Sequence, residues 1–468
     1  MKFKTTGILA AILAVLVVIV YFGDVKRSEK KKQVEEKESK LVQVEPDSIR
    51  EIILKPSGIH LVKQKDQWEI LEPVYTRADR SAVQGIVSTF RWAKRYRTVA
   101  SDSVNFADYG LAPPRYDIIL VHSAGKDTIH LGDKTPTGTY VFARMNHENK
   151  VFTTTTSLLN HAKKTLYNLR DKTVLPFEKD QVNEIVLKNR HGRFDIVKEG
   201  ENWKLKKPIE TDAEKFKVDD ILGRLRNARA KKFVEEQAKA KDLAKYGLTH
   251  PTVRVDLTVG ADKAKKTLLI GKRKGTQYYA KDENRPPVFL VDSLLVHNLQ
   301  VSAFDLRKKK LFNFLTTQVD SLELIYPASH FVCAKDTNGT WVVLEPERRK
   351  AKAWRMSGIA GTVVGVRAKK FISEKPTNLA KYHLDKPLVE VKLYGNGKLL
   401  ADLRLGSSTK DGIYAMAGDK GPIVLVNKNT LDKLKFTLDD IAEPKPEPVA
   451  AADTAKADTA KAGTSSGQ

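Results

Sequence analysis

Histidine and cysteine are the residue types in this sequence that most readily bind metals or carry redox chemistry. The ten histidines are scattered, and the most suggestive pair is His122 and His130, eight residues apart in neighbouring strand-like segments. A zinc site needs three or four protein ligands, and no third ligand accompanies this pair. Cys333 is the single cysteine, which excludes an intrachain disulfide, a thiolate cluster and a redox pair. We therefore predict no metal site, and we interpret Cys333 as a small buried apolar side chain.

Motifs for nucleotide binding are also missing. The sequence has neither Gly-x-Gly-x-x-Gly nor Gly-x4-Gly-Lys-Ser/Thr. The segment Gly395-Asn396-Gly397 is typical of a turn between strands. No pair of carboxylates suited to acid–base catalysis recurs at the period described below. We predict no catalytic residue and no cofactor, and we do not expect an enzyme.

Basic residues are the polar residues that do recur. Three segments combine alanine, two cations and an aromatic residue, at spacings of 137 and 138 residues, and their cations are Lys94 and Arg95, Lys231 and Lys232, and Lys369 and Lys370. Together with a net charge of +25, they suggest contact with an anionic partner such as phospholipid or a wall polymer. The alternative is structural, because cations at a helix C-terminus complement its dipole by about 0.3–1 kcal/mol. Both interpretations stay open.

These cations belong to a pattern that the chain repeats three times. A tryptophan is followed five residues later by proline at Trp68, Trp203 and Trp341, which lie 135 and 138 residues apart. A second marker is Tyr-Gly-Leu at Tyr109 and Tyr246, with Tyr382-His383-Leu384 in the third copy. A third marker is a Leu-Gly or Ile-Gly pair, which ends at Gly132, Gly271 and Gly406. Three markers in the same order at a nearly constant period indicate three copies of one domain.

Each copy predicts the same succession of strands and helices. An opening strand alternates apolar and polar residues, a second strand carries the tryptophan, and proline ends it because proline lacks the N–H that pairs strands. A helix follows whose apolar stripe is Val83, Ile86, Val87 and Phe90 in copy 1, Val218, Ile221, Leu222 and Leu225 in copy 2, and Met356, Ile359, Ala360 and Val363 in copy 3. Two to four further strands and one closing helix, Ser157–Leu169 in copy 1, complete the unit.

The fold class that follows is α+β, with a mainly antiparallel sheet and two helices in each copy. We place the copies at residues 44–177, 178–314 and 315–442, after a charged stalk at 24–43 and before a tail at 443–468 that we expect to be disordered. The repeated tryptophans are predicted to pack in the core and the Tyr-Gly-Leu tyrosines to anchor turns. His383 is interpreted as a tolerated substitution for glycine.

The N-terminus predicts a membrane anchor at residues 1–23. Residues Thr5 to Gly23 carry no charge, and 19 helical residues span about 28 Å, close to the bilayer hydrocarbon thickness of about 30 Å. The alternative is a cleaved signal peptide, but no small-x-small cleavage site follows the apolar run. Charges flank both ends of the run, so orientation is ambiguous by the positive-inside rule. We expect a single-pass signal anchor in the cytoplasmic membrane, with the bulk of the chain on the extracytoplasmic side.

The Trp-x4-Pro strand end, the apolar helix, the Tyr-Gly-Leu-x2-Pro turn and the Leu-Gly strand end together resemble a bacterial family known as domain-of-unknown-function family 4340. The resemblance covers nearly all of residues 44–440, and copy 3 departs from it at His383 and in lacking the Leu-Arg exit found at Leu169 and Leu306. It implies an N-terminal anchor, and it implies a gene that is encoded beside those of a transporter permease, an ATPase and an auxiliary protein like those of gliding-motility systems.

Two functions are therefore expected from the sequence. The first is a non-enzymatic, membrane-anchored envelope protein that serves as accessory or scaffold of an ABC-type transporter, with the permease or auxiliary protein as partner. The second is a binding module for an anionic cell-envelope polymer, which would use the repeated basic residues. We do not expect nucleic acid as a partner.

Overall fold

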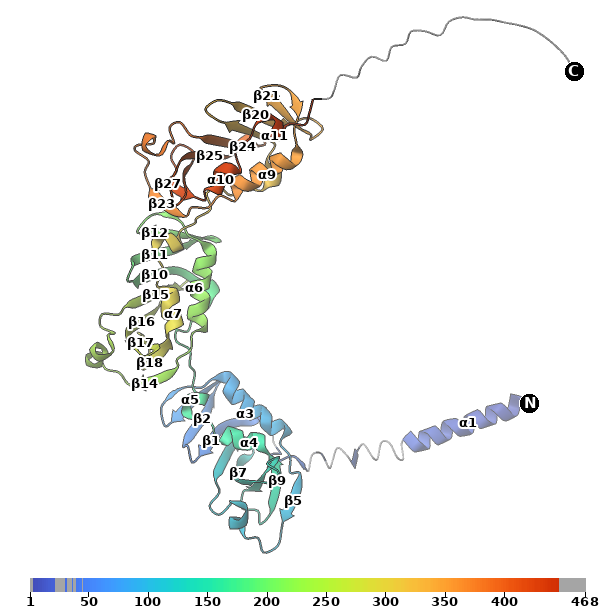
Figure 1. Cartoon of the computed structure of the whole chain (residues 1–468). Helices are drawn as coiled ribbons and strands as arrows, with labels where there is room; N and C mark the ends of the chain where they lie inside the picture. The colour runs from blue at the N-terminus through green and yellow to red at the C-terminus, as the bar shows by residue number, and fades with distance from the viewer. Residues whose placement is uncertain (1–2, 22–29, 32–35, 37–38, 44, 446–468) are drawn as a thin grey trace, which may run out of the picture. The chain divides into compact units, whose positions relative to one another are not determined.

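The computed structural model describes residues 3–21, 30–31, 36, 39–43 and 45–445. Most of the predicted stalk and tail, and the ends of the predicted anchor, lie outside the described residues. The first element is α1, Phe3–Val20, and its large apolar side chains from Ile8 to Val18 are exposed. None of the described helices combines the length and apolar character needed to cross a membrane. Three tandem domains follow, numbered 1 to 3 after the copies, and each is a nine-stranded antiparallel sheet with a few helices (Figure 1).

Domain 1 has the strand order β4-β3-β2-β1-β6-β7-β8-β9-β5. Its strands are β1 Ile49–Lys55, β2 Ile59–Gln64, β3 Gln67–Glu72, β4 Thr76–Arg77, β5 Arg97–Ala100, β6 Tyr116–His122, β7 Gly125–Lys134, β8 Tyr140–Met145 and β9 Val151–Thr155. Its helices are η2 Pro46–Ser48, α3 Arg80–Trp92, η3 Phe106–Tyr109, α4 Thr156–Ala162 and α5 Leu166–Leu169.

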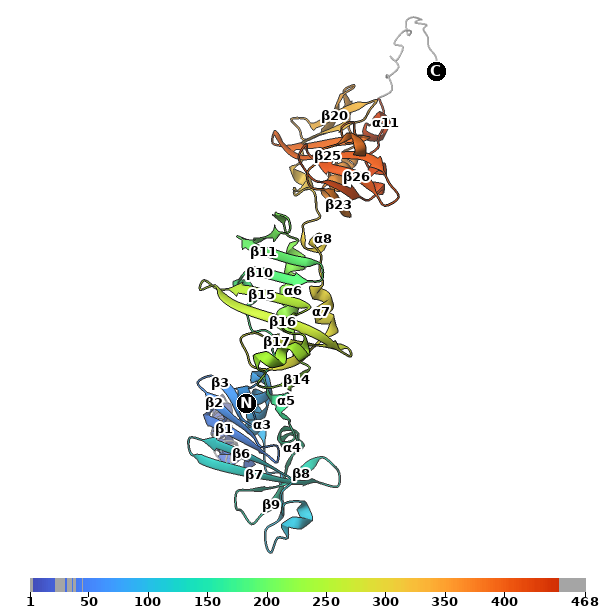
Figure 2. The ribbon, with the colours of Figure 1, turned by 90° about the vertical axis from the view of Figure 1, so that its left-hand side faces the viewer.

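Domain 2 repeats this order as β13-β12-β11-β10-β15-β16-β17-β18-β14, and Figure 2 shows its central strands side by side. Its strands are β10 Val182–Asn189, β11 Gly192–Glu199, β12 Asn202–Lys207, β13 Thr211–Asp212, β14 Lys232–Glu235, β15 Val253–Val259, β16 Ala264–Lys274, β17 Gln277–Asp282 and β18 Val288–Asp292. Its helices are η4 Lys179–Gln181, α6 Lys215–Asn227, η5 Ala240–Tyr246, α7 Ser293–Leu299 and α8 Ala303–Leu306.

Domain 3 has the order β22-β21-β20-β19-β24-β25-β26-β27-β23. Its strands are β19 Ser321–Ile325, β20 His330–Lys335, β21 Trp341–Glu345, β22 Arg349–Lys350, β23 Lys370–Ser373, β24 Val389–Gly395, β25 Lys398–Ser408, β26 Ile413–Ala417 and β27 Ile423–Val426. Its helices are η6 Thr316–Gln318, α9 Ala353–Val364, η7 Ala380–Tyr382, α10 Asn429–Asp432 and α11 Leu438–Ile441.

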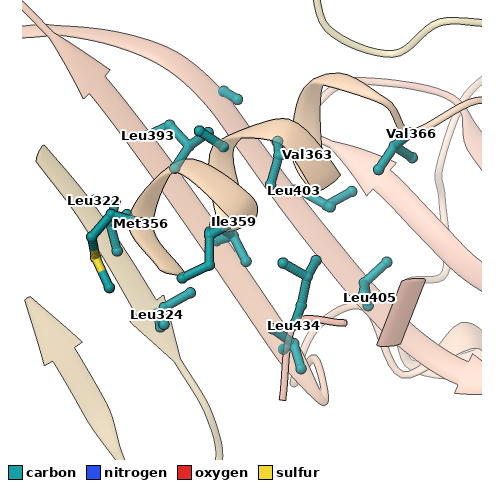
Figure 3. Close-up of a cluster of buried hydrophobic side chains, with 14 of the residues drawn as sticks. Leu322, Leu324, Met356, Ile359, Val363, Val366, Leu393, Leu403, Leu405 and Leu434 are labelled. Carbon is teal, nitrogen blue, oxygen red and sulfur yellow. The ribbon is translucent and has the colours of Figure 1, made fainter. Parts of the chain in front are cut away.

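The core of each domain lies between the long helix and one face of the sheet, as the apolar stripe predicts. In domain 3, Met356, Ile359 and Val363 of α9 point toward leucines of β19, β24 and β25 (Figure 3). The predicted stripes of α3 and α6 are buried in the same way. Full burial of one such side chain contributes about 1.5–3 kcal/mol, so the stripe holds the helix on the sheet. The three repeated tryptophans are also buried, which confirms their prediction as core residues.

The predicted closing helix is wrong in one respect, because two short helices replace it. In domain 1 the helix is interrupted between α4 and α5. The side chain of Thr165 accepts from the N–H of Asn168, and Oδ1 of Asn168 accepts from the N–H of Thr165. Ser302 with Asp305 and Thr437 with Asp440 form the same capping box in domains 2 and 3. A capping box starts a new helix by binding its free N–H groups. The spacing Ser/Thr-x-x-Asn/Asp was visible in the sequence as the signal for this break.

The Tyr-Gly-Leu turn and the Leu-Gly strand end are two sides of one contact. The glycine of each strand end lies against the carbonyl oxygen of the turn tyrosine, so that a Cβ on Gly132, Gly271 or Gly406 would overlap with that oxygen. The turn itself ends in a left-handed residue, Gly110, Gly247 or His383. Histidine tolerates this conformation better than bulky residues do, which explains the departure in copy 3.

Short segments before each domain pair with the residues that follow its long helix. The N–H of Leu41 donates to the carbonyl of Ala93, and those of Val174 and Leu311 donate to the carbonyls of Ala228 and Val366. Residues 39–41, predicted as stalk, therefore pair with domain 1. The same hydrogen bonds place Ala93, Ala228 and Val366 at one structural position, which fixes the alignment of the copies.

The Leu-Arg exits of copies 1 and 2 make the same buried contact. Arg170 stacks on Phe233 and donates to both carboxylate oxygens of Glu236, at 2.6 and 3.0 Å. Arg307 stacks on Phe371 and pairs with Glu374 at 2.6 Å. Each contact lies within one compact unit of the chain, residues 1–190 with 221–300 for Arg170 and residues 191–220 with 301–468 for Arg307. Copy 3 has Ala442 at this position, in line with the missing exit.

The lone cysteine leads to a first prediction. Cys333 is fully buried in β20, and burial raises the pKa of its thiol to about 12. Because the thiolate is the reactive form, its population near pH 8 falls by roughly a thousandfold relative to an ordinary cysteine. We expect the folded chain to resist a disulfide thiol reagent at pH 8 and to react at once in concentrated urea. Equal rates with and without urea would show that Cys333 is accessible in the folded chain.

Candidate functional site

The six cations predicted from the sequence do not occupy equivalent positions in the three domains. The edge strands β5, β14 and β23, which the sequence analysis missed, begin at Arg97, Lys232 and Lys370. This strand register and the hydrogen bonds of Ala93, Ala228 and Val366 align the three domains. In this alignment, Tyr96 of domain 1 occupies the position of Lys231 and Lys369. The Ala-Lys-Arg segment of copy 1 is therefore two residues out of step with the others. The spacing of 137 residues, against 135 for the tryptophans and the helix stripe, was the signal of this shift.

In domain 1 the two predicted cations bind acidic residues of their own surroundings. Lys94 pairs with Glu36 at 3.0 Å. Arg95 donates to both carboxylate oxygens of Glu148, at 2.7 and 2.8 Å, and its guanidinium lies over the ring of Phe152. A forked guanidinium–carboxylate pair of this kind is a strong local interaction. Arg95 thus has a structural role, and the first copy does not present an equivalent of the other two basic pairs.

In domains 2 and 3 the four predicted cations are exposed. Lys231 lies 3.8 Å from Asp292, and Lys369 donates to the carbonyl of Asp411 at 2.8 Å. Lys232 and Lys370 begin their edge strands, and within the described part of the chain no ion pair involves either side chain. Lys369 lines a concave surface of domain 3 and Lys231 one of domain 2, and neither surface is lined by Lys232 or Lys370.

We call the concave surface of domain 3 the α9 groove. It has a volume of about 730 Å³ and lies between the C-terminal half of α9 and the segment that leads from β27 into α10, two elements that Figure 1 shows together. One wall holds Gly358, Gly361, Thr362, Gly365, Val366, Arg367 and Lys369. The other wall holds Asn427, Asn429, Thr430 and Lys433. Three cations line the groove, and no carboxylate does.

Domain 2 has the same concavity at the equivalent positions, which we call the α6 groove. Its volume is about 410 Å³, and it lies between the end of α6 and the start of α7. Lys231 stands where Lys369 does, and Arg229 where Arg367 does. The opposite wall differs, because Asp292, Leu294 and Asn298 replace Asn427, Asn429 and Lys433. The α6 groove is therefore smaller, more apolar and less positive.

Domain 1 closes the same place with a hydrogen bond. Thr89 occupies the position of Thr362 and His161 that of Lys433, and their side chains lie 2.7 Å apart. Burial and the nearby Lys164 lower the pKa of His161, which favours its neutral form. The same place is thus bridged by a hydrogen bond in domain 1, forms a small groove in domain 2 and forms a larger, more positive groove in domain 3.

The arginines in these grooves also have structural partners. Arg229 donates to the carbonyls of Arg226 and Ala228 at the end of α6, as expected for a cation at a helix C-terminus. Arg367 pairs with Glu214 at 2.7 Å. Arg229 and Arg367 thus each have a partner within the protein. Lys369 and Lys433 are the groove cations that form no ion pair within the described residues.

The histidine pair singled out from the sequence has other partners. His122 lies 3.1 Å from Asp127 and His130 lies 2.8 Å from Asp117, so each imidazole has its own carboxylate. Within the described residues, no group of three or more histidine, cysteine, aspartate or glutamate side chains is placed to hold a metal ion.

Comparison with known families gives three matches along the chain. The family described as domain of unknown function DUF4340 matches residues 68–212, 203–360 and 341–466. Each match begins at one of the repeated tryptophans, and the first two end beyond the tryptophan of the following copy. No curated protein matches the chain. Because the three matches together cover more than half of the sequence, the chain belongs to the DUF4340 family and carries three copies of its domain.

Proposed function

We propose that this chain is a non-enzymatic protein anchored in the cytoplasmic membrane by its N-terminal segment, with its three domains on the extracytoplasmic side. The observation that carries the proposal is the surface of α1. Ile8, Leu13 and Val17 are each more than half exposed, and so are most of the apolar residues around them. A helix that is apolar on all sides is suited to a lipid environment, and apolar surface left in water costs about 25 cal/mol per Å².

Within this proposal, the three domains serve as accessory or scaffold of an ABC-type transporter complex. The support is the resemblance described above and the threefold repetition, which multiplies one surface along a single chain. Co-purification tests it: after mild detergent extraction, a tagged full-length chain is expected to retain a permease, an ATPase or an auxiliary protein. Recovery of the chain with no such partner, under conditions that preserve a known transporter complex, would contradict this assignment.

The anchor itself has a direct test. Leu13→Arg combined with Val17→Arg places two charges in α1, and each is expected to oppose insertion by about 2.5–3.5 kcal/mol. We expect the natural chain to sediment with membranes and the double variant to move to the soluble fraction. Leu399→Arg is the matched control, because Leu399 is an exposed apolar residue of β25. A soluble natural chain, or equal membrane association of all three chains, would refute the anchor. A topology reporter after residue 440 tests the side of the membrane.

A second function is favoured by the α6 and α9 grooves, namely binding of an anionic envelope polymer. Two domains present a concave surface lined by three cations at the same structural position, and the surface of domain 3 is the larger and more positive. We expect the chain to bind purified anionic wall polymer in a salt-sensitive way, because exposed ion pairs are screened by salt. Charge reversal at Lys231 and Lys369 should reduce this binding, whereas reversal at Lys94, whose partner is Glu36, should leave it unchanged. If charge reversal at Lys231 and Lys369 left polymer binding unchanged, the grooves would be excluded as the binding site.

A further inference from the structure

We propose that the α9 groove of domain 3 binds a phosphate ester of a polyol. This inference makes the second candidate function, binding of an anionic polymer, more specific. It depends on that function only because both require an anionic ligand. It assigns the binding to one groove, names the chemical group and predicts that domain 2 binds the same group more weakly.

Three cations line each groove, and the Asp292 carboxylate in the α6 groove makes the α9 groove the more positive of the two. Lys369, from the segment after α9, and Lys433, from the end of α10, both line the α9 groove, so an anion there would lie near two cations from different elements. The α6 groove has neutral Asn298 at the position of Lys433. It also has Asp292 at the position of Asn427, and this carboxylate lies 3.8 Å from Lys231. A carboxylate in the lining both repels an anion and neutralises the lysine that would bind it.

The glycines of α9 keep the groove open. A Cβ on Gly358 or Gly361 would meet no atom within 4 Å, so both positions face open space. Glycine in a helix interior is less stable than alanine by about 0.5–1 kcal/mol, and neither packing nor backbone conformation requires it here. Gly223 at the equivalent position in α6 has the same open surroundings, whereas domain 1, with its bridged surface, has Ser88 there. Gly361 lines the α9 groove, so a larger side chain there would fill part of it.

The neutral polar groups indicate the rest of the ligand. Asn427 and Asn429 offer amide donors and acceptors, and Thr362 and Thr430 offer hydroxyls. Such groups bind the hydroxyls of a polyol, while lysine binds phosphate as a point charge. A volume of about 730 Å³ lies within the usual range of about 300–1,000 Å³ for small-molecule sites. The class that fits is a phosphate group on a hydroxylated carbon chain, whether free, in a polymer or in a lipid headgroup.

The test uses the full-length chain in detergent and measures binding of glycerol 3-phosphate and of a synthetic glycerol-phosphate oligomer by calorimetry. Lys433→Gln removes one groove cation, and we expect it to weaken the Kd for both probes by about tenfold, equivalent to about 1.4 kcal/mol. Asn427→Asp gives the groove the carboxylate of domain 2 and should weaken binding by a similar factor. Gly361→Gln should block the groove without destabilising α9. Lys370→Gln is the matched control, because it removes one exposed charge outside the groove.

Three results would overturn the proposal. The first is that neither probe binds. The second is that Lys370→Gln and Lys433→Gln lose the same amount of affinity, and the third is that Gly361→Gln binds as tightly as the natural chain. The reciprocal change Asp292→Asn in domain 2 should add weak binding, and no gain there would contradict the charge argument. Citrate is the control for an anion without phosphate, and glycerol is the control for a polyol without phosphate. Binding of either as tight as that of glycerol 3-phosphate would show that the groove does not recognise the phosphate ester. Vesicles containing phosphatidylglycerol separate a lipid source from a soluble one. Probe binding without wall-polymer binding would leave the groove site intact while removing the polymer function.

Discussion

Replacing Gly271 by alanine is expected to lower the free energy of unfolding of domain 2 by about 3 kcal/mol or more. The added Cβ would overlap with the carbonyl oxygen of Tyr246 and with the backbone of Gly247. Backbone cannot move aside as a flexible side chain can, so the clash must displace the turn and its packed tyrosine. The ring of Tyr246 lies 4.8 Å from that of Tyr279, and this pair would be disturbed as well.

The measurement is urea unfolding followed by tryptophan fluorescence, with Gly223→Ala as the matched control. Gly223 is the same residue type in the same domain, but a Cβ there meets no atom within 4 Å. We expect Gly223→Ala to be neutral or to stabilise α6 by up to about 1 kcal/mol. Because three domains unfold in one chain, the comparison uses the transition that the variants shift rather than a single two-state fit. Equal midpoints for the two variants would show that the Tyr–Gly contact is dispensable.

The second large effect is expected at Trp203. This side chain is only 3% exposed, and its truncation to alanine should cost about 3–5 kcal/mol. Trp354 is the control, because it is 64% exposed at the start of α9 and its truncation should change stability by no more than about 0.5 kcal/mol. Trp203 is the tryptophan of domain 2, so the urea unfolding of these two variants is followed by far-UV circular dichroism instead of fluorescence. If Trp203→Ala lowered ligand binding and left stability unchanged, the tryptophans would form a ligand-stacking row instead of a core.

Sequence periodicity predicts the elements whose own residues repeat at helical or strand spacing. The stripe from Val83 to Phe90 repeats at helical spacing, so the helix and its buried face follow from the residues alone. The edge strand from Arg97 was missed because it is four residues long and its pairing partner, β9, lies some 50 residues away in the chain. Short strands of this kind are specified by tertiary pairing rather than by their own pattern.

The candidate site shows the same division between local and long-range information. Lys369 could be picked out because its segment recurs, but Lys433 and Asn427 carry no recurring signal in the other copies. The two walls of the α9 groove are separated by about sixty residues and meet only when β23 pairs with β27. The shared Ala-Lys dipeptide also misaligned copy 1, because identity over these two residues concealed the backbone register that places Tyr96 at the position of Lys369.

The hydrogen bond between Thr89 and His161 has a consequence for how such an array can be engineered and how it can diverge. Domains 1 and 3 share one backbone plan, so exchanging a few side chains at this place should convert one state into the other. Tyr96→Lys with His161→Lys would transplant the charge of the open groove onto domain 1, and Lys433→His would begin the reverse conversion. One backbone plan can therefore carry a surface closed by a hydrogen bond in one copy and an open, positive groove in another.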